Sequence, residues 1–211
     1  MKKRLIKSTL LAASVTLILA GCTQKSPEEL VSSATQLMSQ GQYEPAVLEL
    51  KNAVEQKPSD GQIRFLLAQA YVMNGQFFSA EKELERAAEY GVDANEMAPY
   101  LVQVKVNLAK EQEVTDLIKE YLKVEQPTDA VFDAVGYGRY YLVNKGSGFW
   151  GKRAFTYIQG TAPQHRFSML GAAWLQFEAE DYIQSVKLAK DTLSAYPDFP
   201  EGIEVLGLAL E

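Results

Sequence analysis

The chain repeats itself at an interval of 34 residues. When residues 27–60 are placed on residues 61–94, eight positions are identical, among them the pairs Gly41/Gly75 and Ala46/Ala80. An internal period of this length is typical of solenoids, in which each unit is one small supersecondary element that buries its apolar face against its neighbours. The chain is therefore expected to fold as a stack of similar units.

Each unit carries two apolar stripes with helical spacing. In the first unit Leu30, Ala34 and Leu37 fall on one helical face, and Ala46, Leu50 and Ala53 fall on one face of a second helix. Gly41 lies between the two stripes, where a left-handed cap ends a helix. Small alanines suit the point where two helices cross most closely. The pattern predicts two antiparallel helices joined by a short turn.

These residues, with Tyr43 matching Phe77 and Pro58 closing the first unit, resemble the tetratricopeptide repeat. The resemblance implies an all-α, right-handed superhelix of helix-turn-helix units, and we expect the following units: 27–60, 61–94, 95–128, 129–162, 163–199 and a partial unit 200–211. Residues 95–128 lack the turn glycine. Because the last unit has one helix only, the sequence is expected to be a fragment of a longer repeat protein.

The first 21 residues are typical of a secretory signal peptide that is cleaved. Four basic residues precede an apolar stretch that ends at Ala20 and is too short to cross a membrane comfortably. Leu19, Ala20, Gly21 and Cys22 resemble the lipobox of bacterial lipoproteins, which implies that Cys22 is the site of lipid attachment and residues 22–26 a lipidated tether.

Thr23 follows the cysteine, where lipoproteins retained in the inner membrane usually have Asp. The resemblance therefore implies a lipid-anchored protein of the bacterial cell envelope, on the periplasmic face of the outer membrane.

Composition excludes several classes of function. Without the signal segment, 17 basic residues stand against 27 acidic ones, a net charge of −10, which disfavours nucleic-acid binding. A single cysteine and a single histidine, His165, leave no ligand set for a zinc site. His165 lies beside Pro163 and Arg166 without a nucleophile motif and is interpreted as a loop residue. No catalytic residue, metal or cofactor is therefore expected.

Residues 146–152 have the spacing of a phosphate-binding loop, but Arg153 stands where Mg²⁺ needs Ser or Thr, so no nucleotide is expected. We expect a helix from Val131 to Val143, a glycine-rich turn, and a second helix from about Arg153 to Ile158. The turn would project Phe149 and Trp150, which would contact a sugar ring or a partner; the alternative is that both rings pack between units.

The resemblance also implies which positions of each first helix face a groove. Six of them form the candidate partner groove: Val31, Thr35, Met38, Phe65, Gln69 and Met73. This mixed apolar and amide lining suits an extended peptide or an amphipathic helix of an envelope protein. The alternative is that Phe65 and Met73 pack against neighbouring helices.

The lipobox together with Ser26-Pro27-Glu28-Glu29-Leu30 and Leu50-Lys51-Asn52-Ala53 is similar to the repeat lipoprotein of exosortase and PEP-CTERM exopolysaccharide systems. That resemblance implies a non-enzymatic scaffold that binds envelope proteins in polymer production or export and in the linked protein sorting. Two alternatives remain. One is an assembly lipoprotein for type IV pili or outer-membrane proteins, and the other is a carbohydrate-binding lipoprotein.

Overall fold

The computed structural model describes residues 25–144 and 148–211, and the side chains of these residues outside 140–152. This part of the chain contains eleven α-helices and no strand. The helices are α1 (Pro27–Ser39), α2 (Tyr43–Gln56), α3 (Gly61–Met73), α4 (Phe77–Glu89), α5 (Ala94–Asn107), α6 (Glu111–Tyr121), α7 (Asp129–Asn144), α8 (Gly148–Thr161), α9 (Arg166–Glu178), α10 (Tyr182–Ala195) and α11 (Pro200–Leu210).

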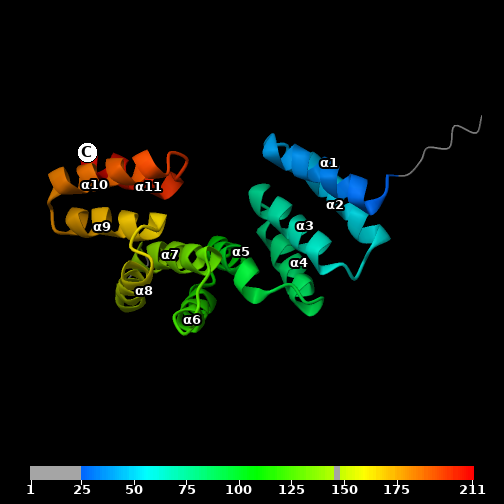
Figure 1. Ribbon diagram of the computed structural model, residues 1–211, viewed down its shortest axis with the longest axis horizontal. Helices are drawn as coiled ribbons and strands as arrows, with labels where there is room; N and C mark the ends of the chain where they lie inside the picture. Colours follow the sequence, from blue (N-terminus) through cyan, green and yellow to red (C-terminus); the bar gives the residue numbers. More distant parts are fainter. Residues whose placement is uncertain (1–24, 145–147) are drawn as a thin grey trace, which may run out of the picture.

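Successive helix pairs are stacked along the long axis of the molecule, from α1 and α2 at one end to α10 and α11 at the other (Figure 1). The first helix of a pair packs against the second in an antiparallel arrangement, as the contacts of α1 with α2 and of α3 with α4 show. The expected all-α solenoid of tetratricopeptide-like helix pairs is confirmed.

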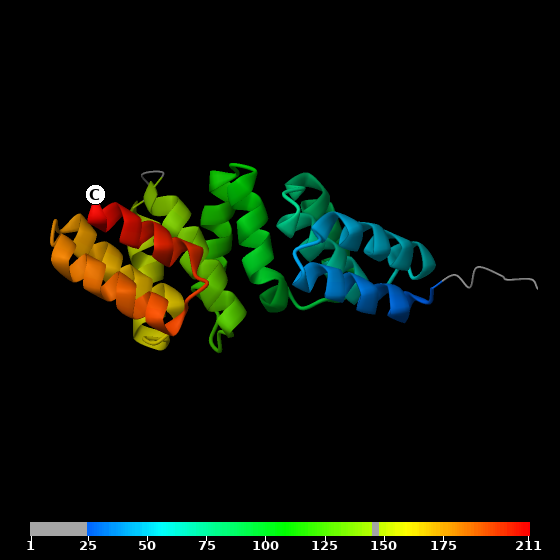
Figure 2. The same ribbon diagram turned by 90° about the horizontal axis from the view of Figure 1, so that it is seen from above.

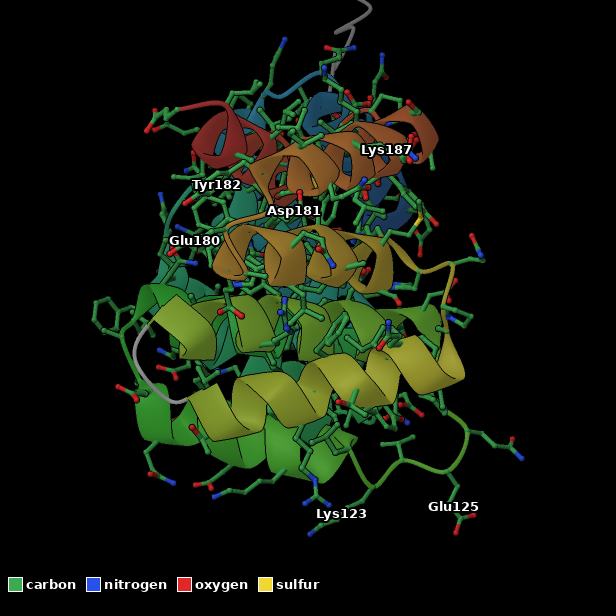
Figure 3. All side chains as sticks on the ribbon, turned by 90° about the vertical axis from the view of Figure 1, so that its left-hand side faces the viewer. Lys123, Glu125, Glu180, Asp181, Tyr182 and Lys187 are labelled. Atoms are coloured by element: carbon green, nitrogen blue, oxygen red, sulfur yellow. The ribbon has the colours of Figure 1, made fainter. Side chains whose placement is uncertain are left out.

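The turns inside the first, second, third and fifth pairs share one backbone conformation with or without glycine. Gly41 and Gly75 both have φ of +72°, and Ala109 and Glu180 take the same left-handed conformation in the third and fifth pairs, with φ of 55° and 61°. A non-glycine residue in this region costs about 1–2 kcal/mol. The Glu180 side chain lies at the outer edge of the turn between α9 and α10 (Figure 3). The absence of a glycine in the third repeat therefore does not change its turn.

The core confirms the alanine pattern. Ala34, Ala46 and Ala53 are fully buried where α1 and α2 meet, and Leu50 fills the space beside them. The second pair adds a buried ion pair, because Nη1 of Arg64 on α3 lies 2.6 Å from Oε2 of Glu83 on α4. Close packing thus holds each pair together and leaves its end faces for the next pair.

The first helices of the later pairs form a continuous row. α7 packs extensively on α5, α9 contacts α7, and α11 contacts α9 (Figure 2). Gly138 permits the close approach on one side of α7, because a Cβ atom there would lie 2.5 Å from Cδ1 of Ile118. This row positions the candidate site.

The fourth pair departs from expectation. The second helix expected from Arg153 to Ile158 is α8, which extends beyond both ends of that range and begins at Gly148. Phe149 and Trp150 therefore stand in the first turn of a helix, and the prediction of a turn that projects them is wrong. Their side chains lie outside the described residues.

Candidate functional site: a charged groove along α5, α7, α9 and α11

Phe65, one of the six residues expected to line a partner groove, lies in the core. Its side chain is 3% exposed, and its ring meets the Tyr100 ring edge-on with centroids 5.4 Å apart. The prediction that Phe65 faces a partner is wrong because α5 of the third pair covers it.

The other five residues are divided between core and surface. Val31 and Met38 are half-buried against the core of the first pair. Gln69 is half-buried, Thr35 is exposed, and Met73 is 49% exposed. None of the five lines the two pockets described next.

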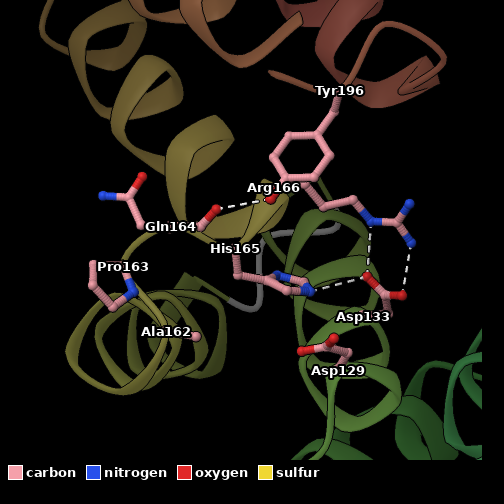
Figure 4. A pocket seen from close by; sticks show the side chains of 8 residues that line it. All are labelled: Asp129, Asp133, Ala162, Pro163, Gln164, His165, Arg166 and Tyr196. Carbon is pink, nitrogen blue, oxygen red and sulfur yellow. Dashed lines mark hydrogen bonds and ion pairs between the residues drawn. The ribbon is translucent and has the colours of Figure 1, made fainter.

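Two neighbouring pockets lie on the row of first helices. The larger, here the histidine pocket, has a volume of about 450 Å³ and is lined by Asp129, Asp133, Ala162, Pro163, Gln164, His165, Arg166 and Tyr196 (Figure 4). The smaller, here the glutamate pocket, has a volume of about 180 Å³ and is lined by Pro99, Gln103, Asp133, Tyr137, Arg166, Phe167, Phe199, Pro200 and Glu201. Because they share Asp133 and Arg166, the two pockets form one groove that reaches from α5 to α11.

A bidentate ion pair forms the boundary between the pockets. Nε of Arg166 donates to Oδ1 of Asp133 at 2.8 Å, and Nη2 lies 2.7 Å from Oδ2 (Figure 4). The guanidinium also lies over the rings of Phe167 and Phe199, at 5.7 and 5.4 Å from their centroids. This fork geometry fixes both side chains, so α7 is tied to α9 at this point.

His165 lies in the loop between α8 and α9, where it is the N-cap of α9. Its Nδ1 accepts a hydrogen bond from the backbone N–H of Phe167 at 3.4 Å, and its Nε2 lies 3.3 Å from Oδ1 of Asp133. The ring stacks on Phe167 and packs beside Phe132. Since Nδ1 accepts, the geometry assigns the proton of the neutral ring to Nε2, which donates to Asp133. The interpretation of His165 as a loop residue is confirmed, and the structure adds that it caps α9 and contacts Asp133.

Glu201 lies half-buried in the glutamate pocket. Burial raises the pKa of its carboxyl above the ordinary value, the charges of Asp133 and Glu204 raise it further, and its own backbone N–H and the charge of Arg166 oppose the rise. No ion pair joins Glu201 to another described residue. Its charge is therefore poorly compensated.

Burial also raises the pKa of Tyr137 on the same wall, with a contribution from Glu201 and an opposing hydrogen bond to Asn107. Tyr137 therefore keeps its hydroxyl proton at neutral pH and offers a donor to a ligand. In the described ranges 25–144 and 148–211, no group of three or more His, Cys, Asp or Glu side chains is placed to hold a metal ion. The groove thus offers carboxylates, one paired guanidinium, an imidazole, a hydroxyl and an amide for recognition.

Sequence inspection missed most of these residues. Asp129, Asp133, Arg166 and Glu201 come from three helices and stand up to 72 residues apart, so no local motif joins them. Asp129, Asp133 and Tyr137 follow one another at intervals of four on α7, which puts them on one helical face. That spacing was the one available signal.

The lipobox residues Leu19, Ala20, Gly21 and Cys22 lie outside the described residues. Among the helices that are described, none is both long and apolar enough to span a membrane.

Comparisons with known proteins support the architecture. The tetratricopeptide repeat family matches residues 37–99, which covers most of the first two helix pairs. The crystal structure of YrrB, "a TPR protein with an unusual peptide-binding site", aligns with a TM-score of 0.53 at 16% identity and covers 83% of this chain and 89% of that one.

The TPR domain of P58(IPK) aligns over 87% of this chain and 55% of that one, at 16% identity and a TM-score of 0.44. No curated protein matches the chain. The property shared with YrrB is the fold of stacked tetratricopeptide-like helix pairs.

Proposed function

We propose that this protein is a non-enzymatic scaffold that binds an extended segment of a partner protein in the groove formed by the histidine and glutamate pockets. The observation that carries the proposal is the continuity of the two pockets through Asp133 and Arg166. The groove is lined by residues of α5, α7, α9 and α11. Its length therefore suits an extended chain better than a compact ligand.

The lining suits main-chain recognition. Gln103 and Tyr137 offer an amide and a hydroxyl on one wall, and His165 and Tyr196 lie on the other. The Tyr196 hydroxyl already donates to the backbone oxygen of Gln164 at 3.0 Å, which holds the loop between α8 and α9 against the end of α10. Polar groups fixed in this way bind a ligand with a small loss of conformational entropy.

YrrB shares the fold, and its published description names a peptide-binding site. This supports peptide binding as the kind of function that such a stack of helix pairs performs.

The lipobox, with Thr23 after its cysteine, leads us to propose that the scaffold is anchored through Cys22 to the periplasmic face of the outer membrane. Its clients would then be envelope proteins. Exopolysaccharide production and PEP-CTERM sorting are proposed as the pathway on the resemblance of the N-terminal residues, and pilus or outer-membrane assembly is the rival.

Photocrosslinking in living cells tests the groove. A photoreactive residue at Asp129, which is exposed and lines the histidine pocket, is compared with one at Glu120, which is exposed on α6 and lines neither pocket. A discrete protein adduct from position 129 alone is expected, and its identity by mass spectrometry also distinguishes the pathways. Equal adducts from both positions, or none from either in folded protein, would refute a client-binding groove.

A further inference from the structure

The groove has an excess of negative charge that its own residues do not balance. Three carboxylates line it, from Asp129, Asp133 and Glu201, against the single guanidinium of Arg166. His165 is already engaged, because its Nε2 lies 3.3 Å from Oδ1 of Asp133 and its Nδ1 accepts a hydrogen bond from the backbone N–H of Phe167. Two negative charges are therefore left over in the groove.

Arg166, the one cation among the described residues that line the groove, is already paired. Both oxygens of Asp133 are engaged by Arg166 through contacts of 2.8 and 2.7 Å, so this pair is close to neutral. Asp129 lies one helical turn before Asp133 and makes no hydrogen bond or ion pair with any described residue. Its carboxylate lies beside the histidine pocket at the start of α7 (Figure 4).

Glu201 is the second uncompensated group. Exposed carboxylates keep their charge at little cost, but Glu201 is half-buried. The charge of Arg166 offsets this burial only in part, because that guanidinium is already paired with Asp133, and the pKa of Glu201 stays raised. A charged group that is removed from water and left unpaired destabilises the protein unless a partner supplies the opposite charge. The pocket therefore favours an external cation.

Each pocket also has apolar lining beside its polar groups. Ala162, Pro163 and the ring of Tyr196 line the histidine pocket together with Asp129, and Pro99 and Phe199 line the glutamate pocket together with Glu201. An apolar wall with a carboxylate beside it matches lysine and arginine, whose aliphatic stems pack on apolar surface while the charged head reaches a polar group.

Resting on the peptide-binding function proposed above, we infer that the partner segment is basic. A lysine or arginine side chain enters the histidine pocket beside Asp129, and a second one enters the glutamate pocket beside Glu201. The Asp133–Arg166 pair separates the two subsites and keeps its own partners when the peptide binds.

A peptide selection tests this inference on the purified full chain. Short linear peptides are selected from a phage-displayed library, and the bound sequences are synthesised with a fluorophore for anisotropy. Each basic residue is then replaced by norleucine, which keeps the stem and removes the charge. The protein variants are Asp129→Asn and Glu201→Gln, neither of which breaks an ion pair, with Glu120→Gln on α6 as the matched charge control.

The selected peptides are expected to contain lysine or arginine. Asp129→Asn and Glu201→Gln should each weaken binding about tenfold or more, Glu120→Gln should not, and the norleucine peptides should lose this difference between variants. Peptides that bind in the groove without a basic residue, or that bind both variants unchanged, would overturn the inference and leave the proposed function standing. Failure of the wild-type chain to bind any peptide would overturn both.

Discussion

Gly136 makes a sharp prediction about how tightly α7 and α9 are packed. It lies inside α7, and a Cβ atom built on it would lie 2.1 Å from Cγ and 2.4 Å from Cβ of Phe167. These atoms are the base of the phenylalanine side chain, so a change of rotamer cannot move both of them away. The substitution Gly136→Ala therefore requires the backbone of α7 or α9 to shift.

The size of the effect follows from two opposing contributions. Alanine is favoured over glycine inside a helix by about 0.5–1 kcal/mol. Overpacking of a close-packed core costs about 1–3 kcal/mol or more, and Phe167 is 4% exposed and packs edge-on against Phe199 with centroids 5.0 Å apart. The net expectation is a loss of about 1–2 kcal/mol in the free energy of unfolding.

Gly160 in α8 is the matched control. It is exposed, and a Cβ atom there would meet nothing within 4 Å. Gly160→Ala makes the same chemical change and the same change in the unfolded chain, so it should stabilise by up to about 1 kcal/mol. Urea unfolding followed by far-ultraviolet circular dichroism measures both variants. Phe167→Ala alone and in the Gly136→Ala background completes a double-mutant cycle.

A positive coupling is expected in that cycle, because Phe167→Ala removes the contacts of Cγ and Cδ2 with the new Cβ atom, at 2.1 and 2.5 Å, and leaves only that of Cβ, at 2.4 Å. If Gly136→Ala is as stable as Gly160→Ala, or if the cost is the same with and without the ring of Phe167, then α7 and α9 are not packed as closely as described.

Three further predictions concern buried charge. Glu83→Gln leaves the buried Arg64 without its carboxylate and should lower the free energy of unfolding in urea by about 3–5 kcal/mol. Glu28→Gln, which breaks an exposed pair with Lys57, is the control and should leave the urea midpoint unchanged. Arg139→Met should stabilise the protein by about 1 kcal/mol or more in the same assay. Burial lowers the pKa of Arg139 to about 10, and its Nε has no hydrogen-bond partner among the described residues. A loss of stability would contradict this prediction. Glu201→Gln should stabilise the protein at neutral pH. Because the pKa of this carboxyl is raised on folding, the wild-type protein loses stability as the pH rises from the ordinary value of 4.5 through the raised pKa, so the gain from the substitution should vanish below pH 4.5. A gain that persists in acid would argue for a cause other than charge.

The sequence predicted the repeat architecture well, because the signals are local. A 34-residue period, alanines at helix crossings and glycines at turns each reflect contacts within one helix pair, and Ala34, Ala46 and Gly41 are placed as expected. The prediction failed where a residue's surroundings depend on the next pair. Phe65 has the spacing of a groove position, yet α5 of the next pair covers it. The start of α8 was missed for a different reason: the glycine-rich segment was expected to be a turn, but the helix begins at Gly148.

By itself, then, the sequence determined the stacked helix pairs and the acidic balance of the chain outside its first 21 residues. Only the tertiary structure decided where that charge matters. Asp133 and Arg166 are distant in the chain, and their pairing depends on the packing of α7 against α9, which also leaves Asp129 and Glu201 without cations. The physical reason is that helix formation follows the periodicity of near neighbours, whereas a binding groove is set by how successive pairs rotate and pack on one another.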